Sequence, residues 1–195
     1  VSCNGGSNGT ARIDSISGGV PPYSTDWFGV DTNNLSVGTY IFTGTDNNGC
    51  TDSSVNTIIE PTQINISTSF TEPSCHGGNN GSISLNVSGA TAPYQYSIDG
   101  GITWQTSNTF NALAAGTYTI QIEDNNGCSS SASETITQPT VLVVSQGNVT
   151  NVSCFGGNDG SLSVNASGAT APYQYSIDGG NTWQNSNTFN TLTAG

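Results

Sequence analysis

Basic side chains are almost absent from this 195-residue sequence. It contains no lysine and one arginine, Arg12, against thirteen Asp and Glu residues, so the formal net charge is −12 at pH 7. Proteins that bind DNA or RNA neutralise phosphates with many Lys and Arg side chains, and anionic membrane surfaces attract basic segments. The composition therefore excludes nucleic acid as a partner and argues against binding to anionic membranes.

Long apolar runs are absent as well. A transmembrane helix needs about 18 consecutive apolar residues, and no such stretch occurs, so we expect no membrane insertion. The chain does not open with the basic and then apolar segments of a signal peptide, so we expect any signal peptide to lie outside it. High net charge with few apolar residues usually indicates disorder. Here, however, Val, Ile, Tyr, Phe and Trp alternate with polar residues, which predicts β-strands.

The sequence repeats itself. Residues 154–195 match residues 75–116 with few changes, and a more divergent copy starts at Cys3. The copies are spaced by 72 and then 79 residues, a length that suits one small β-sandwich per copy. Pro61 and Pro139 stand between copies, where a residue without a ladder donor is tolerated. The predicted domains are 1–60 (a repeat without its first strand), 61–138 (a complete repeat) and 139–195 (a repeat cut before its last strands).

Seven short strands are predicted in the middle copy, separated by turns rich in Gly, Asn and Asp. This count in about 78 residues is typical of an immunoglobulin-like sandwich. Tyr40 and Tyr118 each follow a Gly by two residues, as in a tyrosine corner, although an ordinary core tyrosine is the alternative. The predicted fold class is all-β, an elongated array of tandem small Ig-like β-sandwich repeats. The expected strands are at about 63–70, 81–87, 94–98, 103–106, 108–111, 117–123 and 131–137.

The five cysteines follow the repeat. Two per copy in an acidic, lysine-free chain indicate an oxidising compartment. We expect one disulfide within each copy, Cys3–Cys50 and Cys75–Cys128, while the partner of Cys154 would fall beyond the chain. Closing a loop of about 50 residues contributes roughly 3–4 kcal/mol in the chain-entropy model. The alternative pairs Cys50 with Cys75 across the junction between copies, although in a head-to-tail array these loops should lie far apart.

Two segments, SIDGGITW at 97–104 and SIDGGNTW at 176–183, match the Asp-box pattern. In families that carry this box, the Asp accepts hydrogen bonds from turn amides and the Trp packs beneath the hairpin. Asp and Gly are also the residues that a tight hairpin needs. Asp99 and Asp178 are therefore predicted to be structural turn residues.

Aromatic side chains offer the main candidate ligand surface. Trp104 and Trp183 are candidates for stacking against a sugar, together with Tyr94, Tyr96 and Phe110 in the middle copy. The alternation of Tyr94 and Tyr96 places both on one face of a strand. The alternative, which we favour, is that this face belongs to the core.

Asp46, Asp124 and Asp159 lie in loops rich in Asn and Gly, and carboxylate oxygens suit Ca²⁺. Each loop supplies only one carboxylate, however, and Asp-Asn-Asn-Gly is also a good turn. We therefore predict no metal and no cofactor, with Ca²⁺ at these positions as the alternative. His76 is the only histidine and does not recur in the other copies, so we find no nucleophile–base pair. The chain is predicted not to be an enzyme.

The motifs together resemble the SprB-type repeat of very large surface adhesins of gliding Bacteroidetes. They run as CxGGxxG, a strand, SGxxxPYxYSxDGG, a Trp, LxxGTYT, a strand and DNNGC, and cover nearly the whole chain. The resemblance implies type IX secretion, display on the bacterial cell surface, and a non-catalytic stalk that supports surface adhesion and gliding motility. The expected partners are neighbouring repeats of the same chain, surface polysaccharide and other adhesin or motility components. The alternatives are a carbohydrate-binding module repeat and an accessory domain of a secreted hydrolase.

Overall fold

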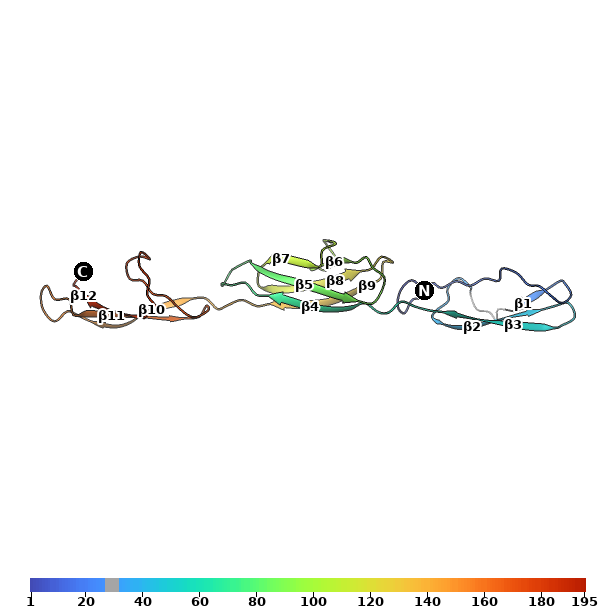
Figure 1. Ribbon diagram of the computed structural model, residues 1–195, viewed down its shortest axis with the longest axis horizontal. Coiled ribbons are helices and arrows are strands. Elements are labelled where there is room, and N and C mark those ends of the chain that lie inside the picture. Colours follow the sequence, from blue (N-terminus) through green and yellow to red (C-terminus); the bar gives the residue numbers. More distant parts are fainter. Residues whose placement is uncertain (27–31) are drawn as a thin grey trace. The chain divides into compact units, whose positions relative to one another are not determined.

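The computed structural model describes residues 1–26 and 32–195, which form twelve β-strands. The strands build several small antiparallel sheets, so the all-β fold class is confirmed, and the sheets are consistent with tandem β-sandwich repeats (Figure 1). Within these ranges there is no helix of the length and apolarity that a membrane span requires. The strands are β1 (Ser24–Asp26), β2 (Gly38–Thr45), β3 (Thr51–Ile58), β4 (Asn65–Thr71), β5 (Gly81–Ser88), β6 (Gln95–Ser97), β7 (Thr109–Leu113), β8 (Gly116–Glu123), β9 (Ser129–Ile136), β10 (Val143–Thr150), β11 (Gly160–Ser167) and β12 (Thr188–Leu192).

Each sheet contains three strands. In the first copy β2 lies between β1 and β3, and in the third copy β11 lies between β10 and β12. The middle copy has two sheets, with the orders β4-β5-β7 and β6-β8-β9, as expected for a sandwich. β2 and β3 pair along their whole length, from Gly38 opposite Ile58 to Thr45 opposite Thr51, and the turn at 46–50 joins them.

Six of the seven strands predicted in the middle copy are present as β4 to β9. The strand predicted at 103–106 is wrong, because this segment forms only an isolated bridge between Gln105 and Tyr96. The cause is local. Asp99 accepts hydrogen bonds from the backbone N–H groups of the two residues at 102 and 103, which keeps them in the turn.

The long strands of the middle copy bury one side. β5 buries Ile83 and Leu85, and β8 buries Ile120 and Ile122, all at 0% exposure. The two residues of each pair are two positions apart, because alternate side chains of a strand point to the same face. Each such side chain contributes about 1.5–3 kcal/mol relative to exposure. These residues therefore provide much of the apolar stabilisation of this copy.

The chain packs into two compact units. The first contains the sheet of β1, β2 and β3, and the second contains the sheet of β10, β11 and β12. Residues of the middle copy belong to both units, so the units do not coincide with the predicted domains, which stay a prediction. The first unit is 1–69, 84–109 and 118–134, and the second is 70–83, 110–117 and 135–195.

The predicted disulfides within each copy are wrong. Cys3 is bonded to Cys128, with Cα atoms 5.6 Å apart. Cys50, Cys75 and Cys154 are free and exposed, so the alternative pair of Cys50 with Cys75 is not formed either. The observed bond joins the first copy to the middle copy.

The first copy shows why its own cysteines do not pair. Cys50 directly precedes β3, whereas the chain around Cys3 lies where β3 ends, since the amino group of Val1 donates to the carbonyl of Ile59 at 2.8 Å. The eight residues of β3 span roughly 25 Å. The Cα atoms of a disulfide are only about 4.4–6.8 Å apart. The two cysteines of one copy therefore lie at opposite ends of its strands.

Candidate functional site

Asp99 organises the first Asp box through both carboxylate oxygens. Oδ1 accepts hydrogen bonds from the backbone N–H groups of Ile102 (3.0 Å) and Thr103 (2.9 Å) and from the Ser97 hydroxyl (2.7 Å). Oδ2 accepts from the Thr103 hydroxyl at 2.5 Å. These donors favour the charged carboxylate, so Thr103 first and then Ser97 lower the pKa of Asp99 from 3.8 to about 2. Asp99 has the turn geometry that its sequence pattern predicts.

Asp178 makes the same contacts in the second Asp box. Oδ1 accepts from the N–H groups of Asn181 and Thr182, both at 3.0 Å, and Oδ2 accepts from the Thr182 hydroxyl at 2.5 Å. The Thr182 donors, followed by the Ser176 hydroxyl, hold the pKa of Asp178 well below its usual range. In both boxes, therefore, both carboxylate oxygens bind the turn.

The tryptophan of each Asp box hydrogen-bonds and packs within its own hairpin. Trp104 donates its indole N–H to the carbonyl of Gly101 at 2.9 Å, and Trp183 donates to Gly180 at 3.0 Å. A Cβ built at Gly101 or Gly180 would lie 3.4 or 3.5 Å from the corresponding indole ring, so each ring packs on the glycine of its turn. Trp104 is half-buried, whereas Trp183 is 59% exposed. Of the two candidate stacking residues, Trp183 thus presents the larger surface to solvent.

Tyrosine hydroxyls anchor turns in all three copies. Tyr40 donates to the carbonyl of Ser36 at 3.0 Å, which is the bond expected of a tyrosine corner. Tyr118, the other predicted corner, lies half-buried in β8. Tyr94 and Tyr173 form a second kind of anchor, which the sequence pattern did not predict: each donates its hydroxyl to the carbonyl of the residue five positions back. The shared segment SGxxxPY of the middle and third copies is the pattern that could have revealed it.

The other aromatic candidates of the middle copy are half-buried. The rings of Tyr94 and Tyr96 meet edge to face, with centroids 6.5 Å apart. Burial, and then the neighbouring Tyr94, raise the pKa of the Tyr96 hydroxyl. Phe110 is half-buried in β7. These three rings are partly covered, which fits the core interpretation better than an open stacking platform.

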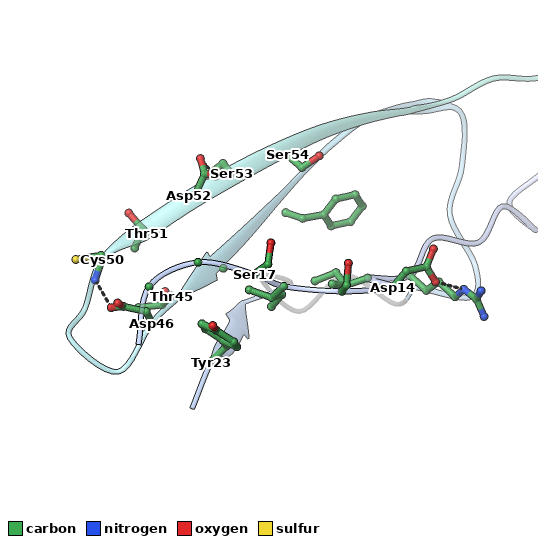
Figure 2. A pocket seen from close by; sticks show the side chains of 18 of the residues that line it. Asp14, Ser17, Tyr23, Thr45, Asp46, Cys50, Thr51, Asp52, Ser53 and Ser54 are labelled. Atoms are coloured by element: carbon green, nitrogen blue, oxygen red, sulfur yellow. Dashed lines mark hydrogen bonds and ion pairs between the residues drawn. The ribbon is translucent and has the colours of Figure 1, made fainter. Parts of the chain in front are cut away.

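Asp46 and Asp124 close equivalent loops. Oδ1 of Asp46 accepts from the N–H of Cys50 at 2.8 Å (Figure 2). The same oxygen accepts from the N–H of Asn48 at 2.9 Å, and Oδ2 accepts from the N–H of Val20 at 3.0 Å. These backbone donors, Val20 first, lower the pKa of Asp46. The corresponding donors to Asp124, which is buried, are Asn126 (2.8 Å), Cys128 (2.9 Å) and Thr91 (3.1 Å).

Asp159 serves a different loop. Its Oδ1 accepts from the N–H of Ser153 at 3.0 Å, and hydrogen bonding from Ser153 lowers its pKa. In the part of the chain that the structure describes, no three His, Cys, Asp or Glu side chains gather as a metal site would require. The carboxylates considered for Ca²⁺ are thus engaged in holding turns.

An open pocket of about 560 Å³ lies in the first copy, between the segment 12–19 and the β2–β3 hairpin (Figure 2). Hydroxyl and carboxylate side chains line it, and Phe42 adds an apolar surface. Arg12 and Asp14 at its edge form a 2.8 Å ion pair, but their side chains are 85% and 74% exposed. An ion pair this exposed contributes at most about 1 kcal/mol. The corresponding segment of the middle copy, about 84–90, begins with the second half of β5, where Leu85 is fully buried.

The junction between the first and middle copies is held by several contacts besides the disulfide. Asn4 donates its side-chain amide N–H to the carbonyl of Pro61 at 3.1 Å, and the N–H of Gly5 donates to the Glu60 carboxylate at 2.6 Å. From the middle copy, the Asn126 side chain donates to the carbonyl of Ser2 at 3.3 Å. The loop around Cys3 therefore binds both the connecting segment and the next copy.

The contacts between the cysteine loop and the connecting segment recur in the second unit, at the start of the third copy. Nδ1 of His76, the counterpart of Asn4, lies 3.2 Å from the carbonyl of Pro139, and the N–H of Gly77 donates to the Gln138 side chain at 2.7 Å. This role of His76 is not among the predictions made from the sequence. Two features of the sequence could have indicated it: a residue with a side-chain nitrogen follows both Cys3 and Cys75, and a Glu or Gln precedes each junction proline.

Comparison with known proteins identifies one family. The family profile described as SprB repeat matches residues 1–32, 67–103 and 146–182, which together make up more than half of the chain. No curated protein matches the chain.

Proposed function

The chain belongs to the SprB repeat family, which is associated with cell-surface proteins, and from that premise we propose that it is a non-catalytic stalk segment of a very large secreted adhesin. In this proposal the parent protein is exported by type IX secretion and displayed on the bacterial cell surface. There the segment supports adhesion to a surface and gliding motility. Its direct partners are the neighbouring repeats of the same chain.

One observation carries the stalk assignment, namely the covalent junction between two copies. A stalk transmits force from one domain to the next, so its weakest points are the connections between domains. The Cys3–Cys128 bond spans such a connection, and hydrogen bonds of Asn4 and Gly5 to the connecting segment surround it. A binding module that acts alone has no need of a covalent link to its neighbour.

The side-chain chemistry supports a non-catalytic role without a cofactor. Asp46, Asp99 and Asp178 use both carboxylate oxygens to accept hydrogen bonds that shape their own loops. The formal net charge of −12 also keeps neighbouring stalks soluble and mutually repelling.

The second candidate function is a carbohydrate-binding repeat, in which the indole rings of Trp104 and Trp183, both at least partly accessible to solvent, would stack on sugar rings. The decisive experiment is calorimetric titration of the full chain with a panel of soluble polysaccharides. It is run beside Trp183→Ala and a matched control, Val55→Ala, which removes a similarly exposed apolar side chain outside the boxes. The stalk proposal expects no binding at millimolar concentrations. Binding that is lost in Trp183→Ala and kept in Val55→Ala would overturn it.

Surface display is tested separately. Antibodies raised against the chain should label intact source cells, and mild external proteolysis should remove the label. Labelling only after the cells are made permeable would contradict the proposed location.

A further inference from the structure

The loops around Cys3, Cys75 and Cys154 have one geometry, although only Cys3 is bonded. In each loop the N–H of the residue before the cysteine donates to the side-chain oxygen of the residue five positions after the cysteine, at 3.0 Å in all three. The second glycine of each loop donates its N–H back to the cysteine carbonyl. These bonds are Gly6 to Cys3 (3.0 Å), Gly78 to Cys75 (3.0 Å) and Gly157 to Cys154 (2.9 Å).

The loops around Cys50 and Cys128 also share one geometry, although only Cys128 is bonded. Oδ1 of the preceding Asp accepts from the N–H of each cysteine, at 2.8 Å for Cys50 and 2.9 Å for Cys128. The backbone carbonyl of each cysteine in turn accepts from the N–H of that Asp at 2.9 Å. Cys50 is therefore held as Cys128 is held, and its thiol is exposed.

The docking of the cysteine loop on the connecting segment is repeated as well. Asn4 and Gly5 reach across to Pro61 and Glu60 at 3.1 and 2.6 Å. His76 and Gly77 contact Pro139 and Gln138 at 3.2 and 2.7 Å, close to the same distances. The loop of Cys75 thus sits against the segment that leads into the third copy as the loop of Cys3 sits against the segment that leads into the middle copy.

We propose that Cys3–Cys128 is one instance of a disulfide that joins every pair of consecutive copies. The first cysteine of each copy, in its CxGG loop, pairs with the second cysteine of the copy that follows, in its DNNGC loop. Cys75 and Cys154 then each pair with the second cysteine of the copy that follows. Cys50 pairs with the first cysteine of the copy that precedes it. This inference does not depend on whether the stalk binds polysaccharide.

The bond forms by thiol–disulfide exchange with a small disulfide such as oxidised glutathione. The thiolate of one cysteine attacks the glutathione disulfide, forms a mixed disulfide and releases one glutathione thiol. The thiolate of the second cysteine then attacks the protein sulfur of the mixed disulfide and releases the second glutathione. Two protein thiols are oxidised by two electrons, the glutathione disulfide is reduced by two, and the two protons end on the glutathione thiols.

The first experiment extends the full chain by repeating residues 117–138 directly after Gly195, which corresponds to Gly116. The extension supplies the third copy with counterparts of β8 and β9 and with a DNNGC cysteine. Both chains are oxidised in a glutathione buffer, alkylated and mapped by peptide mass spectrometry. The chain without the extension should keep three free thiols, Cys50, Cys75 and Cys154. The extended chain should keep two, because the added cysteine pairs with Cys75.

The Cys3–Cys128 peptide in the same digest reports that the extended chain has folded. In the extended chain, Cys75→Ser should leave the added cysteine free. Cys154→Ser should leave the bond between the added cysteine and Cys75 unchanged. An added cysteine that pairs with Cys154, or that stays free while Cys3–Cys128 forms, would overturn the proposal.

A second measurement uses only the 195-residue chain without the extension, so that the proposal is tested even where the extended chain does not fold. At high protein concentration in the same buffer, disulfide-linked oligomers should contain the peptide that joins Cys50 of one chain to Cys154 of another. In this pair Cys154 is the first cysteine of one copy, and Cys50 of the other chain takes the place of the second cysteine of the next copy. Cross-links dominated by symmetric Cys50–Cys50 and Cys154–Cys154 peptides would contradict the inference.

Discussion

Among the residues that the structure describes, the first copy (1–26 and 32–60) buries two apolar side chains, Leu35 and Phe42, whereas the middle copy buries six. The strands differ in the same way. In β3 of the first copy every residue up to Thr57 is exposed, whereas β9 of the middle copy alternates between exposed and covered positions and ends in a buried residue. The described part of the first copy therefore has less apolar stabilisation of its own than the middle copy. The six buried residues of the middle copy are Ile64, Ile83, Leu85, Ile120, Ile122 and Ile136.

The loops of these two copies, in contrast, are nearly identical. The CxGG loops of Cys3 and Cys75 differ by no more than 0.1 Å in the hydrogen bonds that hold the cysteine, and so do the DNNGC loops. Backbone donors and short polar side chains set these loops, and neither depends on how well the interior is packed. The geometry of the end loops is therefore more alike between the two copies than the burial of their apolar side chains. We therefore expect the first copy, whose described part buries fewer apolar side chains, to depend more on the bond to its neighbour.

Cys3→Ser should cause the largest loss of stability, concentrated in the first copy. The bond closes a separation of 125 residues, and the chain-entropy model assigns about 4–5 kcal/mol to a loop of this length. Cys154→Ser is the matched control, because Cys154 occupies the same kind of loop but is free. It should change the free energy of unfolding by less than about 0.5 kcal/mol. Urea unfolding measures the free energy of unfolding of both variants. Equal losses would show that the first copy does not depend on the Cys3–Cys128 bond.

Leu85→Ala should produce the next largest effect, this time in the middle copy. Leu85 is fully buried, and removing such a side chain typically costs about 2–5 kcal/mol. Ile102→Ala is the control, since Ile102 is 83% exposed and its truncation should cost less than about 0.5 kcal/mol. Thermal unfolding checks both variants. If the two variants melted alike, the core assigned to the middle copy would be wrong.

Sequence periodicity predicts what is local in this protein. The alternation that predicts a strand at 117–123 is matched by β8 at Gly116–Glu123, because the side chains that define it are two residues apart. Asp99 is predicted equally well, since all of its donors lie within four residues. The same local chemistry explains the strand wrongly expected at 103–106, where the turn contacts of Asp99 take precedence.

The cysteine pairing and the role of His76 are not local. Cys3 and Cys128 are 125 residues apart, and their pairing depends on which ends of successive copies meet. That is decided by the direction of strands such as β3, whose length separates the two cysteines of one copy. His76 reaches Pro139 over 63 residues for the same reason. Spacing within a single copy carries no information about such contacts.

Acid should weaken the Asp-box hairpins in a defined pH window. Hydrogen bonds from Thr103 and Ser97 lower the pKa of Asp99 from 3.8, the ordinary value of an Asp carboxyl, to about 2 in the folded chain. A carboxylate with a lowered pKa stabilises the fold above the unfolded value, and that contribution is lost as the pH falls from about 4 to about 2. Asp99→Asn should therefore lower the melting temperature at pH 7 and reduce the difference between pH 5 and pH 2. An unchanged acid sensitivity in Asp99→Asn would show that other groups cause it.

Removal of calcium should have the smallest effect of all. Oδ1 and Oδ2 of Asp46 and of Asp124 are each directed to backbone N–H groups of their own copy, so a cation would have to displace donors that hold the loop closed. The melting temperature of the full chain should therefore agree within about 1 °C between EDTA and millimolar CaCl₂, because a ligand that binds only the folded state would raise it. Asp159→Asn, in the other loop considered for Ca²⁺, should behave alike in both buffers. A rise of several degrees with calcium that Asp124→Asn removes would mean that the loop opens to bind the ion, and that the first and middle copies share a metal site as well as a turn.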